Sequence, residues 1–72
     1  MSGPDRDLAP GQVWRHHKSN SYYFIVAVAL HTETQEQLVI YRRTDAHDMW
    51  ARPLEMFLNE AEPGTKRFVR VR

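Results

Sequence analysis

The sequence predicts a small all-β domain, an SH3-like antiparallel barrel of about five strands with one short helical turn before the last strand. Short segments rich in β-branched and aromatic residues alternate with polar turns, which is typical of hairpin-connected strands. Near the C-terminus, Pro53 precedes a short apolar segment with helical spacing. The chain has 72 residues, which leaves room for one domain. An OB-like barrel is the alternative, and it ranks second because it usually needs a longer chain and a longer helix.

Residues 1–10 are expected to be a flexible tail, because two prolines bracket a polar stretch with a single leucine. Residues 11–72 then form the single β-barrel domain. Within it the expected strands are residues 12–17, 22–31, 37–43, 49–52 and 66–71. The polar segments 18–21 and 32–36 are expected to be hairpin connections, and 44–48 a longer turn without glycine. Residues 59–65 contain Pro63-Gly64 and are expected to be a loop.

The strongest strand candidate is 22–31, in which both alternating faces are largely apolar. Strict alternation predicts one face that runs from Tyr22 to Leu30 and another that runs from Tyr23 to His31. After the fourth strand, Pro53 is pre-set for the first position of a helical turn. Apolar residues at i, i+3 and i+4 then predict a turn with one buried face, formed by Leu54, Phe57 and Leu58.

Composition limits the functional classes. The chain has no cysteine, which excludes disulfides and thiolate chemistry and suggests a reducing compartment, most simply the cytoplasm. The start of the sequence lacks the apolar run of a signal peptide. The longest apolar run, 22–30, is much shorter than the ~20 residues of a spanning helix, so no membrane association is expected. The net charge of +1 argues neither for nor against nucleic acid.

The order of several unusual residues resembles a small bacterial family of domains of unknown function. The family pattern is GxxWRHxK, then Tyr-x-Val, then His-(Ser/Thr)-Glu-Thr, then Val-x-Tyr, and finally WxRPLxMF. The matching residues are Gly11, Trp14, Arg15, His16, Lys18, Tyr23, His31, Thr32, Glu33, Thr34, Tyr41, Trp50, Arg52, Pro53, Leu54, Met56 and Phe57. Gln35 and the turn 45–48 depart from the pattern because they lack its glycines. The resemblance implies a fold and a place to look for a site, and no activity.

His16, His31 and Glu33 are candidates for a catalytic site, since a carboxylate can orient a histidine that titrates near neutral pH. No nucleophile or oxyanion hole accompanies them, so an enzyme is not predicted. The alternative role for each histidine is to cap a strand end by hydrogen bonding. No metal site is predicted, because the histidine and aspartate spacings match no known ligand set. No cofactor is predicted either.

Arg52 lies between Trp50 and Pro53, inside the most distinctive octet of the chain, WARPLEMF. It is expected to form a partly buried ion pair with Glu55 or Glu33 that fixes the corner of the barrel. The alternative is that its planar fork binds a carboxylate or phosphate of a ligand.

Aromatic and basic residues together predict a surface groove of the kind that binds peptides or nucleic acid strands. The candidate ligand-binding residues are Trp14, Arg15, His16, Tyr23, His31, Glu33, Tyr41, Trp50 and Arg52. One of the two tryptophans is expected to be partly exposed. The predicted function is a non-enzymatic binding module for a protein segment or other ligand. The alternatives are a barrel that binds single-stranded nucleic acid, and a small enzyme or metabolite site that uses His16, His31 and Glu33.

Overall fold

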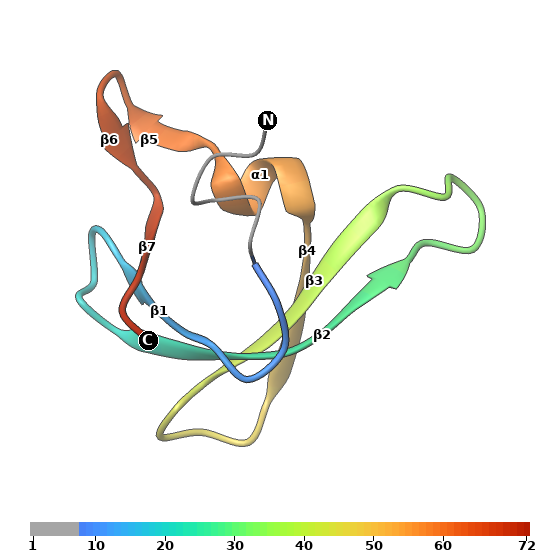
Figure 1. Cartoon of the computed structure of the whole chain (residues 1–72), viewed down its shortest axis with the longest axis horizontal. Coiled ribbons are helices and arrows are strands. Elements are labelled where there is room, and N and C mark those ends of the chain that lie inside the picture. Colours follow the sequence, from blue (N-terminus) through green and yellow to red (C-terminus); the bar gives the residue numbers. More distant parts are fainter. Residues whose placement is uncertain (1–7) are drawn as a thin grey trace.

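A computed structural model describes residues 8–72 and consists mainly of one five-stranded antiparallel sheet. The sheet strands are β1 (Val13–His16), β2 (Tyr22–Leu30), β3 (Gln37–Arg43), β4 (Met49–Pro53) and β7 (Phe68–Arg70). Their order across the sheet is β4-β3-β2-β1-β7. The strands curve around a shared interior, and the short helix α1 (Leu54–Leu58) lies over one end of it (Figure 1). The predicted small all-β, barrel-like fold with one short helix is confirmed.

The predicted alternation along the second strand is interrupted. A register shift lies between Ile25 and Ala27, so Ile25 pairs with Tyr41 whereas Val28 pairs with Val39. Such a bulge lets the strand bend, and it moves the inward-facing positions from odd to even residues, since Tyr41 and Val39 are both buried. The expectation of two continuous faces is therefore wrong beyond Ile25. The change of face is possible because both odd-numbered and even-numbered positions of this strand carry apolar residues.

The predicted loop at 59–65 is also corrected. It contains β5 (Glu60–Glu62), which pairs with β6 (Thr65–Lys66) around Pro63-Gly64. The predicted last strand, 66–71, is split at Arg67 into β6 and β7. The Arg67 N–H donates to the Asn59 carbonyl (3.0 Å), and its own carbonyl accepts from the His17 N–H (2.8 Å). The backbone thus passes at Arg67 from the small hairpin to the main sheet.

The core is built mainly from aromatic rings. Its buried members are Trp14, Ile25, Val39, Tyr41, Phe57 and Phe68. Phe57 from α1 stacks on Phe68 with ring centroids 4.0 Å apart, and its ring meets the edge of Trp14 at 5.5 Å. Leu54 and Leu58 are partly buried against the same cluster, as the helical spacing predicts. A five-residue helix therefore closes the core of this short chain.

The predicted N-terminal tail falls largely outside the described residues. At its end, Leu8 is partly buried and packs against the core. In residues 8–72, no helix has the length and apolar character needed to cross a membrane.

Candidate functional site

The inner face of the curved sheet carries a cluster of partly exposed aromatic and basic side chains. Alternation along β1 places Trp14 and His16 on this face and Arg15 on the outer one. The imidazole of His16 meets the Phe68 ring edge-on at 4.9 Å and the Tyr23 ring at 6.3 Å. Trp14 is fully covered, whereas His16 and Tyr23 are only partly buried. Solvent exposure on this face therefore increases along β1, from the buried Trp14 to the partly exposed His16.

Arg52 of β4 reaches the same cluster without a carboxylate partner. Its Nε donates to the Tyr41 hydroxyl at 3.2 Å, and its guanidinium carbon lies 5.9 Å from the centre of the Phe68 ring. The predicted ion pair with Glu55 or Glu33 is wrong: in residues 8–72 no carboxylate lies within ion-pair distance of Arg52, and the arginine that pairs with a carboxylate is Arg43, with Asp45. A phenol hydroxyl and a ring face hold Arg52 instead, which leaves its positive charge unpaired in this part of the chain.

Trp50 completes the cluster on its open side. It lies opposite Tyr41 in the β3–β4 ladder, so the two side chains share a face. Trp50 is 55% exposed and Trp14 is 1% exposed, which confirms that one tryptophan is partly exposed. We refer to His16, Tyr23, Tyr41, Trp50 and Arg52 as the aromatic–basic site.

Phe68 supports this site although the sequence did not single it out. Its ring contacts His16, Tyr23, Tyr41 and Phe57, and Arg52 lies over it. The pairing of β7 with β1 brings it there from the end of the chain. Short strands in a single sequence do not reveal such a long-range register, and the one local signal at Phe68 is its aromatic character.

Four of the nine predicted ligand-binding residues lie outside the aromatic–basic site, beginning with Trp14 and Arg15. Trp14 is buried in the core, where its Nε1–H donates to Gln12 Oε1 at 3.0 Å, so it lines no surface groove. Arg15 projects from the outer face, where its Nη1 donates to Asn20 Oδ1 at 2.8 Å. That bond holds the β1–β2 turn, in which Asn20 has a positive φ of 58°. Strand alternation explains why consecutive residues 14, 15 and 16 have three different environments.

His31 and Glu33 lie at the far tip of the β2–β3 hairpin. His16 adjoins the start of β2, because its N–H donates to the Ser21 carbonyl, whereas His31 follows the other end of that nine-residue strand. At about 3.3 Å per residue, the strand separates them by roughly 25 Å. The proposed constellation of His16, His31 and Glu33 is therefore not assembled, and the alternative that relies on it is not supported.

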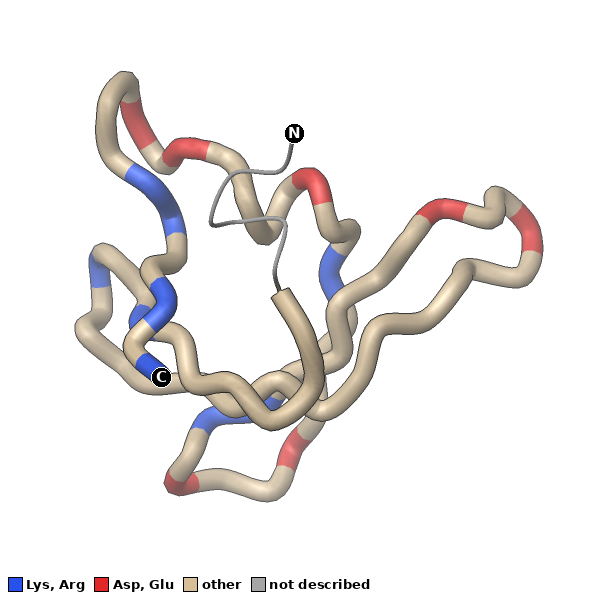
Figure 2. The backbone as a smooth tube through the Cα atoms, in the orientation of Figure 1, with Lys and Arg blue, Asp and Glu red and all other residues tan. Residues whose placement is uncertain are grey.

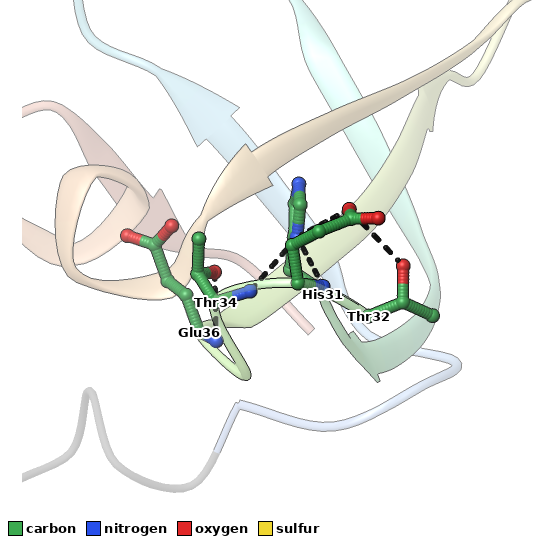
Figure 3. Close-up of polar contacts among 5 residues, drawn as sticks. His31, Thr32, Thr34 and Glu36 are labelled. Atoms are coloured by element: carbon green, nitrogen blue, oxygen red, sulfur yellow. Dashed lines mark hydrogen bonds and ion pairs between the residues drawn. The ribbon is translucent and has the colours of Figure 1, made fainter.

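His31 instead caps its own turn (Figure 3). Its Nδ1 accepts the backbone N–H groups of Glu33 (3.1 Å) and Thr34 (3.3 Å). Thr34 Oγ1 in turn accepts the N–H of Glu36 at 3.1 Å. These bonds satisfy backbone donors in a turn where Gln35 takes a positive φ of 60°. Of the two roles considered for His31, the structure supports the strand-end cap. No group of three potential metal ligands is present among residues 8–72.

Charge is distributed unevenly around the molecule (Figure 2). Lysines and arginines gather along β6, β7 and the neighbouring β1–β2 turn, whereas most carboxylates lie on the hairpin tips and α1. The pKa of His16 is lowered, first by burial and then by the positive charges of Arg52, Arg67, His17 and Lys18. His16 and Arg52 thus share a positive electrostatic environment.

Comparison with known proteins places this geometry in a family. The model of a protein family of unknown function, DUF1653, matches residues 12–70. A crystal structure of a DUF1653 protein from Bordetella bronchiseptica is similar, with a TM-score of 0.74 and 32% sequence identity over 92% of this chain and 90% of that one. No functionally curated protein matched. The family match over nearly the whole described domain shows that this chain belongs to the DUF1653 family, as the sequence pattern had indicated.

Proposed function

We propose that this domain is a non-enzymatic binding module that holds an extended segment of another protein at the aromatic–basic site. The observation that carries the proposal is the pairing of an exposed Trp50 with an Arg52 that has no carboxylate partner in residues 8–72. Tryptophan and arginine are the residues most enriched among binding hot spots. Trp50 is 55% exposed, so a partner that covers its ring would remove a large apolar area from water, which favours binding.

The position of β4 supports an extended ligand. β4 is the last strand on its side of the sheet, and no other strand in the described residues pairs with its outer edge. An extended segment can add to such an edge through main-chain hydrogen bonds, while side chains on one face give specificity. Trp50 and Arg52 are two residues apart, so they present a ring and a charge on the same face. An acidic or phosphorylated segment with an apolar neighbour would complement this pair.

The test is a binding screen of the full chain against a library of extended peptides, followed by two matched variants. Trp50→Ala should weaken the best binder by about tenfold or more, as expected for a hot-spot tryptophan. Met49→Ala removes a neighbouring side chain that is also exposed but projects to the other face, and it should leave the affinity within about twofold. Equal losses in the two variants would reject the proposal.

Single-stranded nucleic acid is the competing ligand. The salt dependence of the affinity distinguishes it from a peptide. Binding of a single strand depends on released counterions, so its affinity falls steeply as salt rises. The peptide complex makes only one or two charge contacts, so it should lose no more than about fivefold in affinity between roughly 50 and 200 mM salt. A single-stranded oligonucleotide that binds more tightly than any peptide, with a steep salt slope, would favour the nucleic acid function instead.

A further inference from the structure

Arg52 is fixed in a geometry that suits an anion. Its Nε is already used by the Tyr41 hydroxyl, and the Phe68 ring lies beneath its guanidinium carbon. In residues 8–72 neither Nη1 nor Nη2 has a hydrogen-bond partner. No buried side-chain nitrogen or oxygen of these residues lacks a partner, so both amino groups reach the surface. An arginine held this way presents its two-pronged end to a ligand oxygen pair with little loss of side-chain freedom.

His16 provides a second donor beside it. The Ser19 N–H donates to His16 Nδ1 at 3.3 Å, and Ser19 Oγ lies 3.2 Å from the same nitrogen. Because Nδ1 accepts a backbone N–H, the neutral ring carries its hydrogen on Nε2. Nε2 has no partner among residues 8–72, and by the same reasoning it is not buried. His16 and Arg52 both lie near the ring of Phe68, at 4.9 and 5.9 Å from its centre, and the charge of Arg52 acts on His16, so the two residues are neighbours in one site.

The positive charges that act on His16 are more than are needed to balance the single negative charge of a carboxylate ligand. Arg67, His17 and Lys18 act on His16 in addition to Arg52, and no carboxylate in the described residues counters them there. Arg67 is positioned by a hydrogen bond from its Nε to Asn59 Oδ1 at 2.9 Å. A phosphate carries about −1.5 to −2 charges and three acceptor oxygens, so it gains more from this cluster than a carboxylate does.

We propose that Arg52 and His16 form a phosphate subsite, which in the bound protein segment receives a phosphorylated side chain. This inference rests on the proposed function for the identity of the ligand, while the subsite itself rests on the donors and charges just described. The Arg52 fork would take two phosphate oxygens and His16 Nε2 the third. Trp50, two residues from Arg52 on the same face, would cover the apolar residue next to the phosphorylated one.

Anion binding at this subsite is coupled to the protonation of His16. The charged or titratable groups that face His16 are Arg52 from β4, Tyr23 from β2, Arg67 before β7, and His17 and Lys18 from the β1–β2 turn. Burial first, and then the cations among them, lower the pKa of His16, and a bound dianion would offset the effect of the cations. A dianion that does not itself titrate should therefore bind more tightly as the pH falls from 8 to 5.5.

The first experiment uses simple anions. The full chain is titrated with inorganic phosphate, sulfate and sodium acetate at constant ionic strength, and chemical shifts of the His16 ring and the Arg52 Nε–H are followed. Phosphate and sulfate should bind at this site about tenfold more tightly than acetate, as expected from their charge and number of acceptors. Sulfate affinity should rise about threefold or more between pH 8 and 5.5 if one histidine is protonated on binding. Equal affinity for acetate would overturn the inference.

Variants locate the effect. Arg52→Gln should abolish the sulfate shifts, whereas Arg15→Gln removes the same charge from the outer face and should leave them unchanged. His16→Gln keeps an amide donor near Nε2 and removes the titration, so sulfate affinity should no longer change with pH. Equal losses for Arg52→Gln and Arg15→Gln would show a diffuse charge effect and overturn the subsite. If Arg52→Gln proves poorly folded, the pH dependence of the unmodified chain still decides the question.

Peptide pairs separate this inference from the proposed function. A segment with phosphoserine or phosphotyrosine should bind at least about tenfold more tightly than its unphosphorylated form, consistent with one to three charge-assisted hydrogen bonds. If both forms bind equally and both depend on Trp50, the proposed function stands and the phosphate subsite is wrong. If free phosphate binds at Arg52 and His16 but no peptide does, the subsite stands and the peptide function is wrong.

Discussion

The Nε–H of Arg52 donates to the hydroxyl of Tyr41 across the β3–β4 ladder, at a distance of 3.2 Å. Tyr41 is 6% exposed and belongs to the core, whereas the outer end of the Arg52 guanidinium reaches solvent. The bond therefore links the packing of the domain to the orientation of its candidate ligand-binding arginine.

Removing the hydroxyl of Tyr41 tests that link directly. Tyr41→Phe keeps the ring contacts with Tyr23 and Phe57, so the loss of stability should be about 1 kcal/mol, typical of one hydrogen bond. Ligand affinity should fall because Arg52 is no longer oriented. Urea unfolding and a peptide titration measure the two effects. Tyr22→Phe, on the outer face, is the control, and an equal loss of affinity there would contradict the assigned role of Tyr41.

The stability of the domain should depend strongly on Phe57. Its ring is 0% exposed and stacks on Phe68, so Phe57→Ala should cost about 3–5 kcal/mol, enough to unfold a domain of this size. The neighbouring Met56 is 49% exposed, and Met56→Ala should change stability by less than about 0.5 kcal/mol. Circular dichroism melting curves of the two variants provide the comparison. A folded Phe57→Ala variant with nearly unchanged stability would show that α1 does not close the core.

Gln35 gives a prediction about turn geometry. A non-glycine residue with a φ of 60° is strained, and glycine at this position removes the strain. Gln35→Gly should therefore stabilise the domain by roughly 0.5–1 kcal/mol. Gln37 lies in β3, where glycine is unfavourable, so Gln37→Gly should destabilise it. Chemical denaturation of both variants measures the contrast, and destabilisation by both would contradict the strained turn.

The cap formed by His31 should be structural and independent of ligand binding. His31→Ala removes the acceptor for the N–H groups of Glu33 and Thr34, which should exchange with solvent faster. The expected cost is about 1 kcal/mol, similar to the loss of a helix cap. Peptide affinity should be unchanged, since the hairpin tip lies at the far end of β2. A large loss of peptide affinity in this variant would show that His31 takes part in ligand binding.

His16 should make the stability of the unliganded domain depend on pH. Its folded pKa is lowered below the ordinary value of 6.5, so the unfolded chain binds a proton more readily than the folded one. The contribution is fully present above pH 6.5 and is lost as the pH falls below that value toward the folded pKa. Urea unfolding between pH 5 and 8 should show this loss, and His16→Gln should reduce it. An unchanged pH profile in the variant would contradict the assignment to His16.

The sequence predicted the elements better than their long-range relations. Local signals were sufficient for β3 and for the buried face of α1, because alternation and helical spacing are read over a few residues. The β5–β6 hairpin was missed because its strands are only three and two residues long and carry no apolar pattern. The bulge at Ile25 was hidden since apolar residues occupy both parities of β2.

The candidate site was predicted in part for the same reason. Trp50 and Arg52 share a face by simple alternation, so their association follows from the sequence. The placement of His16 and Phe68 beside them depends on how β1 pairs with both β2 and β7. The β1–β7 pairs join residues more than fifty positions apart. Trp14 was wrongly predicted to bind a ligand. It stands next to arginine and histidine in the sequence, but its ring is buried in the core.

Ligands are expected to bind on the inner face of the sheet, around Trp50 and Arg52. The most direct measurement is a chemical-shift map of the full chain with its best peptide from the screen, recorded with side-chain signals of tryptophan and arginine. We expect the largest changes at the Trp50 indole, the Arg52 Nε–H, the His16 ring and the β4 amides. Changes confined to the outer face around Arg15 and Arg42, or to the β2–β3 hairpin tip, would show that ligands do not bind at the aromatic–basic site.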